Sequence, residues 1–225
     1  MDSILSAHAI TREVDTKSGL LTILDDVNLE LKAGESLAIK GASGSGKSTL
    51  LGVLAGLDVH HRGKVVLDGH DITKLSEDQR ALLRADKIGF VFQSFYLIDD
   101  LTALENVALP LELFGHAKAL SNAADWLSRL GLADRMAHFP RQLSGGEQQR
   151  VALCRAFAVK PTILFADEPT ANLDTATAQS MLDQLFSLQR EQNTSMVIAT
   201  HDEHLSERCD RILQLESGQF LVESS

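Results

Sequence analysis

The chain has 225 residues, 44% of them hydrophobic, and a net charge of −10, so it can bury one substantial core. The acidic balance and the lack of any block of Lys or Arg argue against a general nucleic-acid binder, which needs a basic face to displace counterions. No stretch approaches the roughly 18 uncharged apolar residues that a membrane-spanning helix needs.

The first third of the chain is predicted to be rich in β-strands. Apolar or alternating runs lie between Gly and Asp turns in "AITREV" (9–14), "LTILDDVNLEL" (21–31), "ESLAIKG" (35–41), "GKVVLDG" (63–69) and "KIGFVFQ" (87–93). From about Ser94 to Leu143 the spacing becomes helical, and Gly131 ends one of the expected helices.

The rest of the chain alternates helices and strands. A mostly buried helix, "QQRVALCRAFAV", stops before Pro161, and the amphipathic helix "ATAQSMLDQLFSLQREQ" separates the strands "TILFAD" and "SMVIAT". A final hairpin turns at Ser217-Gly218. This order predicts an α/β fold with a parallel sheet core, an antiparallel β portion in front and an inserted helical part. We expect a single domain over 1–225 with the helical subdomain at approximately 94–157.

A phosphate-binding loop is predicted between the strand "SLAIK" and the helical "TLLGVLAGL". The segment "GASGSGKST" (41–49) fits G-x-x-x-x-G-K-[ST] in the strand–loop–helix context that this motif requires. Its backbone N–H groups would wrap the β-phosphate, Lys47 would bridge the β- and γ-phosphates, and the Ser48 hydroxyl would bind Mg²⁺. The alternative is a Gly/Ser-rich surface loop.

Polar residues at three other strand ends complete this site. Asp167 follows "ILFA" and is expected to hold Mg²⁺, while Glu168 could polarise the attacking water. His201 follows the strand "SMVIAT" and could contact the γ-phosphate or the water. The carbonyl of Gln93 could complete the metal shell. Taken alone, each would be an ordinary solvated strand end.

The segment "LSGGEQQR" (143–150) is a second candidate anion site. A Ser-Gly-Gly turn that enters a helix offers free N–H groups and lets a phosphate approach closely, although a simple helix cap would have the same sequence.

The chain resembles the nucleotide-binding domain of ATP-binding cassette (ABC) transporters over essentially its whole length. The motifs that carry the resemblance are, in order, the P-loop (Gly41, Ala42, Ser43, Gly44, Ser45, Gly46, Lys47, Ser48, Thr49), the Q-loop Gln93, the signature (Leu143, Ser144, Gly145, Gly146, Glu147), the Walker B strand with Asp167 and Glu168, the D-loop "ANLD" with Asp174, and the switch His201. The sequences "GFVFQSFYLIDDL" and "CRAFAVKPTILFADEP" most resemble those of the LolD, MacB and FtsE group and, within that group, those of the YbbA type.

The resemblance implies a P-loop NTPase fold of the RecA-like kind and an ATPase that uses ATP and Mg²⁺. It also implies a homodimer in which the signature of one copy closes over the ATP held by Lys47 of the other, an isologous arrangement. A separate membrane permease would dock near Gln93 to Leu101, although this segment could instead pack within the helical subdomain.

One departure from the family's pattern affects the base. Most relatives carry an aromatic residue in the N-terminal β region that stacks on adenine, whereas here the first aromatic residue is Phe90 and Val14 aligns with that position. We therefore expect base selectivity to be weak.

The N-terminus and the cysteines indicate the compartment. "MDSILSAHAITREVD" lacks the basic start and apolar run of a signal peptide, and Cys154 and Cys209 are more typical of reduced packing residues than of a disulfide. We expect a cytoplasmic protein, held at the inner face of the cell membrane by its permease. Alternatives within the family are a mechanical regulator, and a cassette of translation or DNA maintenance, which would carry two cassettes or a coiled coil and a basic surface.

Overall fold

The computed structural model describes residues 3–17 and 19–221, and the chain divides into two compact units. The first unit holds the residues up to 84, 165–167 and those from 195 onward. The second unit holds 85–164 and 168–194.

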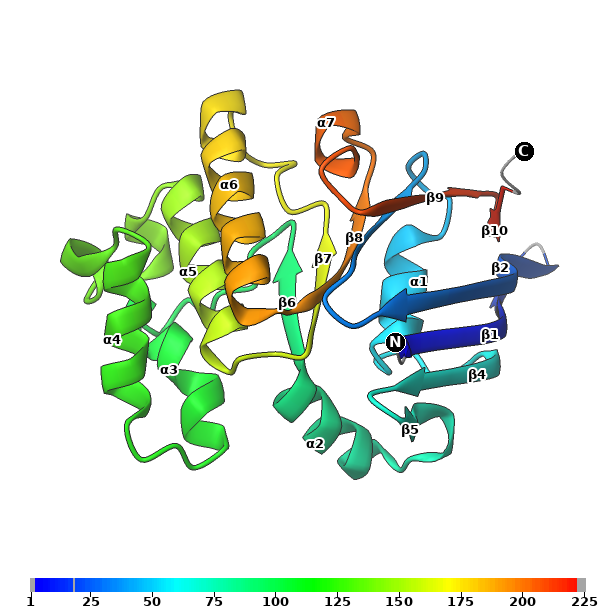
Figure 1. Cartoon of the computed structure of the whole chain (residues 1–225), viewed down its shortest axis with the longest axis horizontal. Helices are drawn as coiled ribbons and strands as arrows, with labels where there is room; N and C mark the ends of the chain where they lie inside the picture. Colours follow the sequence, from blue (N-terminus) through cyan, green and yellow to red (C-terminus); the bar gives the residue numbers. More distant parts are fainter. Residues whose placement is uncertain (1–2, 18, 222–225) are drawn as a thin grey trace. The chain divides into compact units, whose positions relative to one another are not determined.

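An antiparallel sheet begins the first unit. Its strands, in spatial order, are β2 (Gly19–Lys32), β1 (Ser3–Thr16), β4 (Arg62–Leu67) and β5 (His70–Asp71), followed by a short 3₁₀ helix, η1 (Ile72–Lys74) (Figure 1). Side chains alternate at the start of β1, where Leu5 and Ala7 are fully buried, and Ile10 is buried after a register shift that follows Ala7. This alternation is typical of a sheet with one face on the core.

A parallel sheet forms the rest of the first unit. Its strands are, in order, β10 (Gln219–Phe220), β9 (Arg211–Glu216), β3 (Ser36–Lys40), β8 (Ser195–Thr200) and the 165–167 end of β7 (Ile163–Asp167). β3 runs parallel to both β8 and β9. All residues of β8 are buried, as expected for a strand covered on both faces. Helices α1 (Lys47–Leu54) and α7 (Glu203–Ser206) pack against β8.

The second unit is mainly helical. It contains β6 (Ile88–Phe92) beside the 163–164 end of β7, and the helices α3 (Ala103–Leu113), α4 (Ala119–Arg129), α5 (Gly145–Ala158) and α6 (Thr175–Gln192), with short 3₁₀ helices η2 (Ala133–Arg135) and η3 (Pro140–Gln142). α3, α4 and α5 pack against one another, and α5 also contacts α6 and β6. The centre of α5 is therefore almost entirely buried, from Val151 to Cys154.

The predicted fold class is confirmed, but two local predictions are wrong. The helical pattern expected from Ser94 begins only at Ala103, where Thr102 caps α3 through its hydroxyl and Glu105. Helix α2 (Glu77–Lys87) was not predicted at all. It buries none of its residues, and its few apolar residues, Ala81 to Leu83, stand among charged ones.

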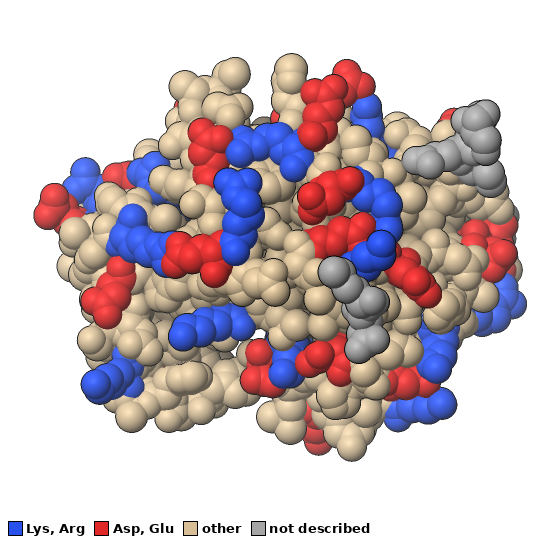
Figure 2. Space-filling view, in the orientation of Figure 1, with Lys and Arg blue, Asp and Glu red and all other residues tan. Residues whose placement is uncertain are grey.

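The cysteines and the surface agree with the composition. Cys154 and Cys209 form no disulfide. Burial raises the pKa of both thiols, that of Cys209 to about 12, so neither thiol is expected to be a reactive thiolate at neutral pH. On the face in Figure 2, basic side chains are interrupted by acidic ones, with no continuous basic area. Among the described residues, no helix is both long and apolar enough to cross a membrane.

Candidate functional site

The P-loop lies where β3 ends and α1 begins, in the first unit. Gly44 and Gly46 have φ of 80° and 103°, in the left-handed region that glycine adopts without strain. Gly46 caps α1 without any side-chain hydrogen bond to the first turn. Because no side chain covers the start of this helix, its backbone N–H groups and positive dipole end can receive an anion.

Lys47 is folded into this loop. Its side chain is buried, and its Nζ donates to the carbonyls of Gly41 at 2.8 Å and Ala42 at 3.0 Å. The ammonium group is thereby held at the centre of the loop. Ser48 is exposed at the first turn of α1, and Thr49 behind it is half-buried.

His201 lies beside the P-loop at the carboxyl edge of the parallel sheet. In the parallel pairing of β3 with β8, Lys40 is opposite Thr200, so Gly41 and His201 leave the same edge on neighbouring strands. Lys40 Nζ also donates to Glu203 at 2.5 Å, which ties the P-loop strand to α7. Asp167 ends β7, the neighbour of β8, and is half-buried.

Val14 lies at the far end of β1, opposite Leu21 of β2. Val14 is half-buried, while the Leu21 side chain is 53% exposed. The hairpin therefore offers an aliphatic surface around Val14.

The signature begins α5 in the second unit. Ser144 and Glu147 form a capping box: the Ser144 Oγ accepts from the Glu147 N–H at 3.3 Å, and Glu147 Oε2 accepts from the Ser144 N–H at 2.8 Å. Glu147 also accepts from Arg135 Nε at 2.8 Å. The Ser144 N–H bond, with this ion pair, lowers the pKa of Glu147 to about 2. The start of the signature helix is thus fixed from both sides.

This network predicts how acid affects stability. Because the pKa of Glu147 is lowered on folding, its contribution is present at neutral pH and is lost as pH falls from about 4.5 to about 2. We expect Glu147→Gln to have a lower urea midpoint than wild type at pH 7. The two midpoints should converge toward pH 2, whereas a constant gap would contradict the assignment.

A pocket of about 270 Å³ joins the signature to the D-loop. It is lined by Ser144, Gly145, Gly146, Arg150, Asn172, Leu173, Asp174 and Thr177. Asp174 caps α6, where its Oδ1 accepts from the Thr177 N–H at 3.0 Å. The predicted signature residues and Asp174 therefore meet in one place, although Leu143 is buried and Glu147 serves the cap rather than the pocket.

Arg150 was missed by the sequence analysis. The spacing holds a signal for it, because Arg150 is four residues after Gly146 and so shares its helix face. Its Nε is buried and makes no hydrogen bond within the described residues. A cationic side chain with an unused donor lines this pocket.

Gly146 lies close to α6. A Cβ at this position would lie 2.6 Å from Cγ2 of Thr177, so the Thr177 side chain would have to move to admit one.

Two further candidates flank this unit's strands. Glu168, directly after β7, has φ of 45°, a left-handed conformation that costs on the order of 1–3 kcal/mol for a non-glycine residue. Gln93 follows β6, and its carbonyl accepts from Asn172 Nδ2 at 2.8 Å. The Gln93–Asn172 contact spans 79 residues of sequence, so no local pattern could have indicated it.

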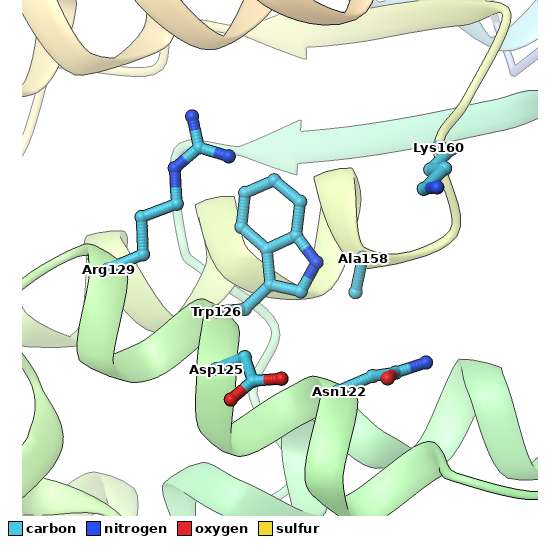
Figure 3. A pocket seen from close by; sticks show the side chains of 6 residues that line it. All are labelled: Asn122, Asp125, Trp126, Arg129, Ala158 and Lys160. Carbon is cyan, nitrogen blue, oxygen red and sulfur yellow. The ribbon is translucent and has the colours of Figure 1, made fainter.

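Another hollow in this unit, of about 310 Å³, holds none of the predicted residues (Figure 3). It is lined by Asn122, Asp125, Trp126, Arg129, Ala158 and Lys160. The Arg129 guanidinium lies 4.9 Å from the centroid of the Trp126 ring and is paired with Glu191.

Comparison with known proteins decides the family. The family model described as "ABC transporter" matches residues 24–171. The chain belongs to the ABC transporter family. This ABC cassette is 51% identical to the ABC transporter ATP-binding protein YbbA of Escherichia coli (strain K12) over 225 residues, 99% of each chain. It is 44% identical to the lipoprotein-releasing system ATP-binding protein LolD of Legionella pneumophila (strain Paris), over 97% of each chain.

A solved ABC cassette has the same fold. The structure described as the dimeric post-hydrolysis state of the ATP-binding cassette MJ0796, bound to ADP and Pi, superposes with a TM-score of 0.89 at 39% identity, over 97% of each chain. The predicted resemblance to the LolD and YbbA types is confirmed. The chain is an ATP-binding cassette of the transporter type, and membership of this family is consistent with ATP hydrolysis.

Proposed function

We propose that residues 1–225 form one cassette, with a helical subdomain at 94–157, that hydrolyses ATP as a head-to-tail homodimer and drives a separate membrane permease. The observation that carries the proposal is the signature pocket. It combines a helix start with the unused Nε of Arg150, and both favour an anion. The chain's P-loop is a complete phosphate cradle, so a second anion site fits a nucleotide held by another copy.

In this proposal, the P-loop binds the nucleotide phosphates. The N–H groups of Gly41 to Gly46 surround the β-phosphate, Lys47 moves from the loop carbonyls to the phosphates, and Thr49 supports the first turn of α1. Ser144, Gly145 and Gly146 of the second copy close over the γ-phosphate, next to the D-loop with its Asp174.

The residues present fit Mg²⁺. A hydroxyl at Ser48 and a carboxylate at Asp167 are the hard oxygen ligands that this ion prefers. Among the described residues, no cluster of three or more His, Cys, Asp or Glu is gathered for a metal. This suits an ion that takes its other ligands from phosphates, water and the Q-loop Gln93. When bound, Mg²⁺ would neutralise phosphate charge.

Hydrolysis needs a base and a contact to the γ-phosphate. Glu168 is proposed to orient and deprotonate the water, and its strained backbone is typical of residues held at functional sites. His201, at the edge shared with the P-loop, is proposed to contact the γ-phosphate. Loss of that phosphate would remove the contact that holds the two copies together.

The aliphatic hairpin predicts how the base is recognised. Without stacking worth about 1–3 kcal/mol, the phosphates should dominate affinity, so wild type should discriminate weakly between ATP and GTP. Val14→Tyr should bind ATP about tenfold more tightly. Titration of both chains with both nucleotides is the measurement. An unchanged affinity in Val14→Tyr, with strong wild-type preference for ATP, would place adenine elsewhere.

The permease is proposed to dock on 93–101, which holds the cassette at the inner face of the membrane. Tyr96 and Ile98 are 66% and 44% exposed, beside the acids Asp99 and Asp100. The LolD relatives are ATP-binding proteins of a lipoprotein-releasing system. We propose that the permease driven by this cassette works in export, in lipoprotein release or in mechanical transmission.

A membrane-binding experiment tests this docking. Tyr96→Asp with Ile98→Asp should reduce several-fold the cassette retained by membranes of its source cell, while the isolated chain keeps its ATP hydrolysis. Leu120→Asp is the matched control, because Leu120 is 50% exposed on α4. Equal retention of both variants would argue for another docking surface.

A further inference from the structure

The turn after β6 holds an unfavourable backbone conformation. Phe95 and Tyr96 are consecutive, and both have positive φ, 60° and 45°. Left-handed conformations are disfavoured for residues with a bulky side chain because Cβ approaches the following carbonyl. Two of them in succession persist only where the surroundings hold them.

Arg155 supplies that hold. Its Nη1 donates to the Tyr96 carbonyl at 2.6 Å and its Nη2 to the Phe95 carbonyl at 2.8 Å. The planar guanidinium offers two donors in a fixed fork, which matches two successive carbonyls aimed the same way. Burial lowers the pKa of Arg155, yet the group remains charged at neutral pH, so these bonds are charge-assisted.

Two of the residues that hold this turn lie in elements that are proposed to contact the nucleotide. Arg155 lies on α5, the helix that begins at the signature Ser144. Asn172, in the D-loop, holds the Gln93 carbonyl at 2.8 Å. On the other side, Asn106 of α3 accepts from the Ile98 N–H at 2.8 Å and donates to the Ile98 and Leu101 carbonyls. Hydrogen bonds thus hold the turn at Gln93, at Phe95 and Tyr96, and at Ile98.

We propose that Arg155 is a positioning residue that locks the 93–98 turn into its left-handed conformation and couples that conformation to the signature helix. A partner that binds the exposed Tyr96 and Ile98 side chains then acts on the signature through the Arg155 fork. This inference rests on the proposed function, because the partner is the permease and the signature contacts ATP. The lock itself is a property of the isolated cassette.

Arg155→Lys is the sharpest variant, because lysine keeps the charge but has no fork. On the isolated cassette, we expect amide hydrogen exchange in 93–98 to rise at least tenfold and kcat for ATP to fall at least fivefold. Affinity for ATP should stay within twofold, because Lys47 and its loop contacts belong to the first unit. Arg190→Lys, at an exposed position near the end of α6, should change none of these.

A glycine variant separates the lock from simple packing. Phe95→Gly removes the backbone cost of positive φ, so the turn needs the fork less. The increase in exchange caused by Arg155→Lys should therefore be several-fold smaller in a Phe95→Gly background. A packing role would give the same increase in both backgrounds.

Three results would overturn the proposal. Amide hydrogen exchange at 93–98 in Arg155→Lys could match that of wild type, or exchange could rise equally throughout α3 to α5. The third result is an increase in exchange at 93–98 that is the same with and without Phe95→Gly. These outcomes would leave the proposed function standing as long as wild type hydrolyses ATP. If wild type itself hydrolyses no ATP with Mg²⁺, the proposed function fails, whatever the exchange of the turn.

Discussion

Glu168→Gln is expected to slow ATP hydrolysis by about 100-fold or more while ATP binding survives. The amide has the size of the carboxylate but accepts no proton from the attacking water. Glu168 has a left-handed backbone conformation, which a glutamine of the same shape can also adopt. Because the γ-phosphate then persists, the ATP-bound homodimer should accumulate rather than dissociate.

Phosphate release and size-exclusion chromatography with ATP and Mg²⁺ measure the two effects together. Glu216→Gln, at an exposed position on β9, is the control and should match wild type in both. A Glu168→Gln chain that turns over within a few-fold of wild type would remove Glu168 from the base role. One that binds ATP but stays monomeric would count against dimer closure.

Ser144→Arg is expected to abolish hydrolysis and to leave ATP affinity of the same chain unchanged. The long cation would fill the signature pocket of about 270 Å³, where a phosphate is proposed to enter from another copy. The P-loop, with its Lys47 contacts, lies in the other unit of the chain and keeps its own geometry. The loss should therefore appear in turnover alone.

The capping role of Ser144 needs a matched control. Ser144→Arg also removes an N-cap, which costs about 1 kcal/mol of stability. Thr102 and Glu105 form the same capping box at α3, outside the signature pocket. Thr102→Arg should cost a similar stability and keep hydrolysis. If both variants lost turnover equally, the loss would come from fraying of the capped helices. If the Ser144→Arg chain no longer bound ATP at its own P-loop, the signature would not act on the ATP of another copy.

Motifs whose geometry follows from neighbouring residues were predictable from sequence. The P-loop was found because a strand, a glycine loop and a helix are consecutive, and the structure gives β3, the loop and α1 in that order. The start of the signature helix was visible for the same reason, although its capping box engages the Glu147 N–H, which the sequence had left free. His201 and Gly41 share a sheet edge because parallel strands align their carboxyl ends.

Features made by distant residues could not be predicted. The bonds from Arg155 to the 95–96 carbonyls and from Asn172 to Gln93 join residues that only the tertiary fold brings together. Those bonds hold the 93–96 turn, although the helical pattern was expected to begin at about Ser94. The closeness of Gly146 to Thr177 of α6 is likewise a tertiary contact that the local pattern does not show. Helix α2 was not predicted because its few apolar residues stand among charged ones and none of its residues is buried.

Each ATP is proposed to lie between the P-loop of one copy and the signature of another. A mixture of Ser144→Arg and Lys47→Ala chains tests this arrangement, because neither homodimer has an intact site but a mixed pair has one. At equimolar ratio, turnover should rise from near zero to about a quarter of the wild-type rate, since half of random pairs are mixed and each holds one site of two. If the mixture stays inactive at every ratio while mixed pairs form with ATP bound, the composite site is contradicted.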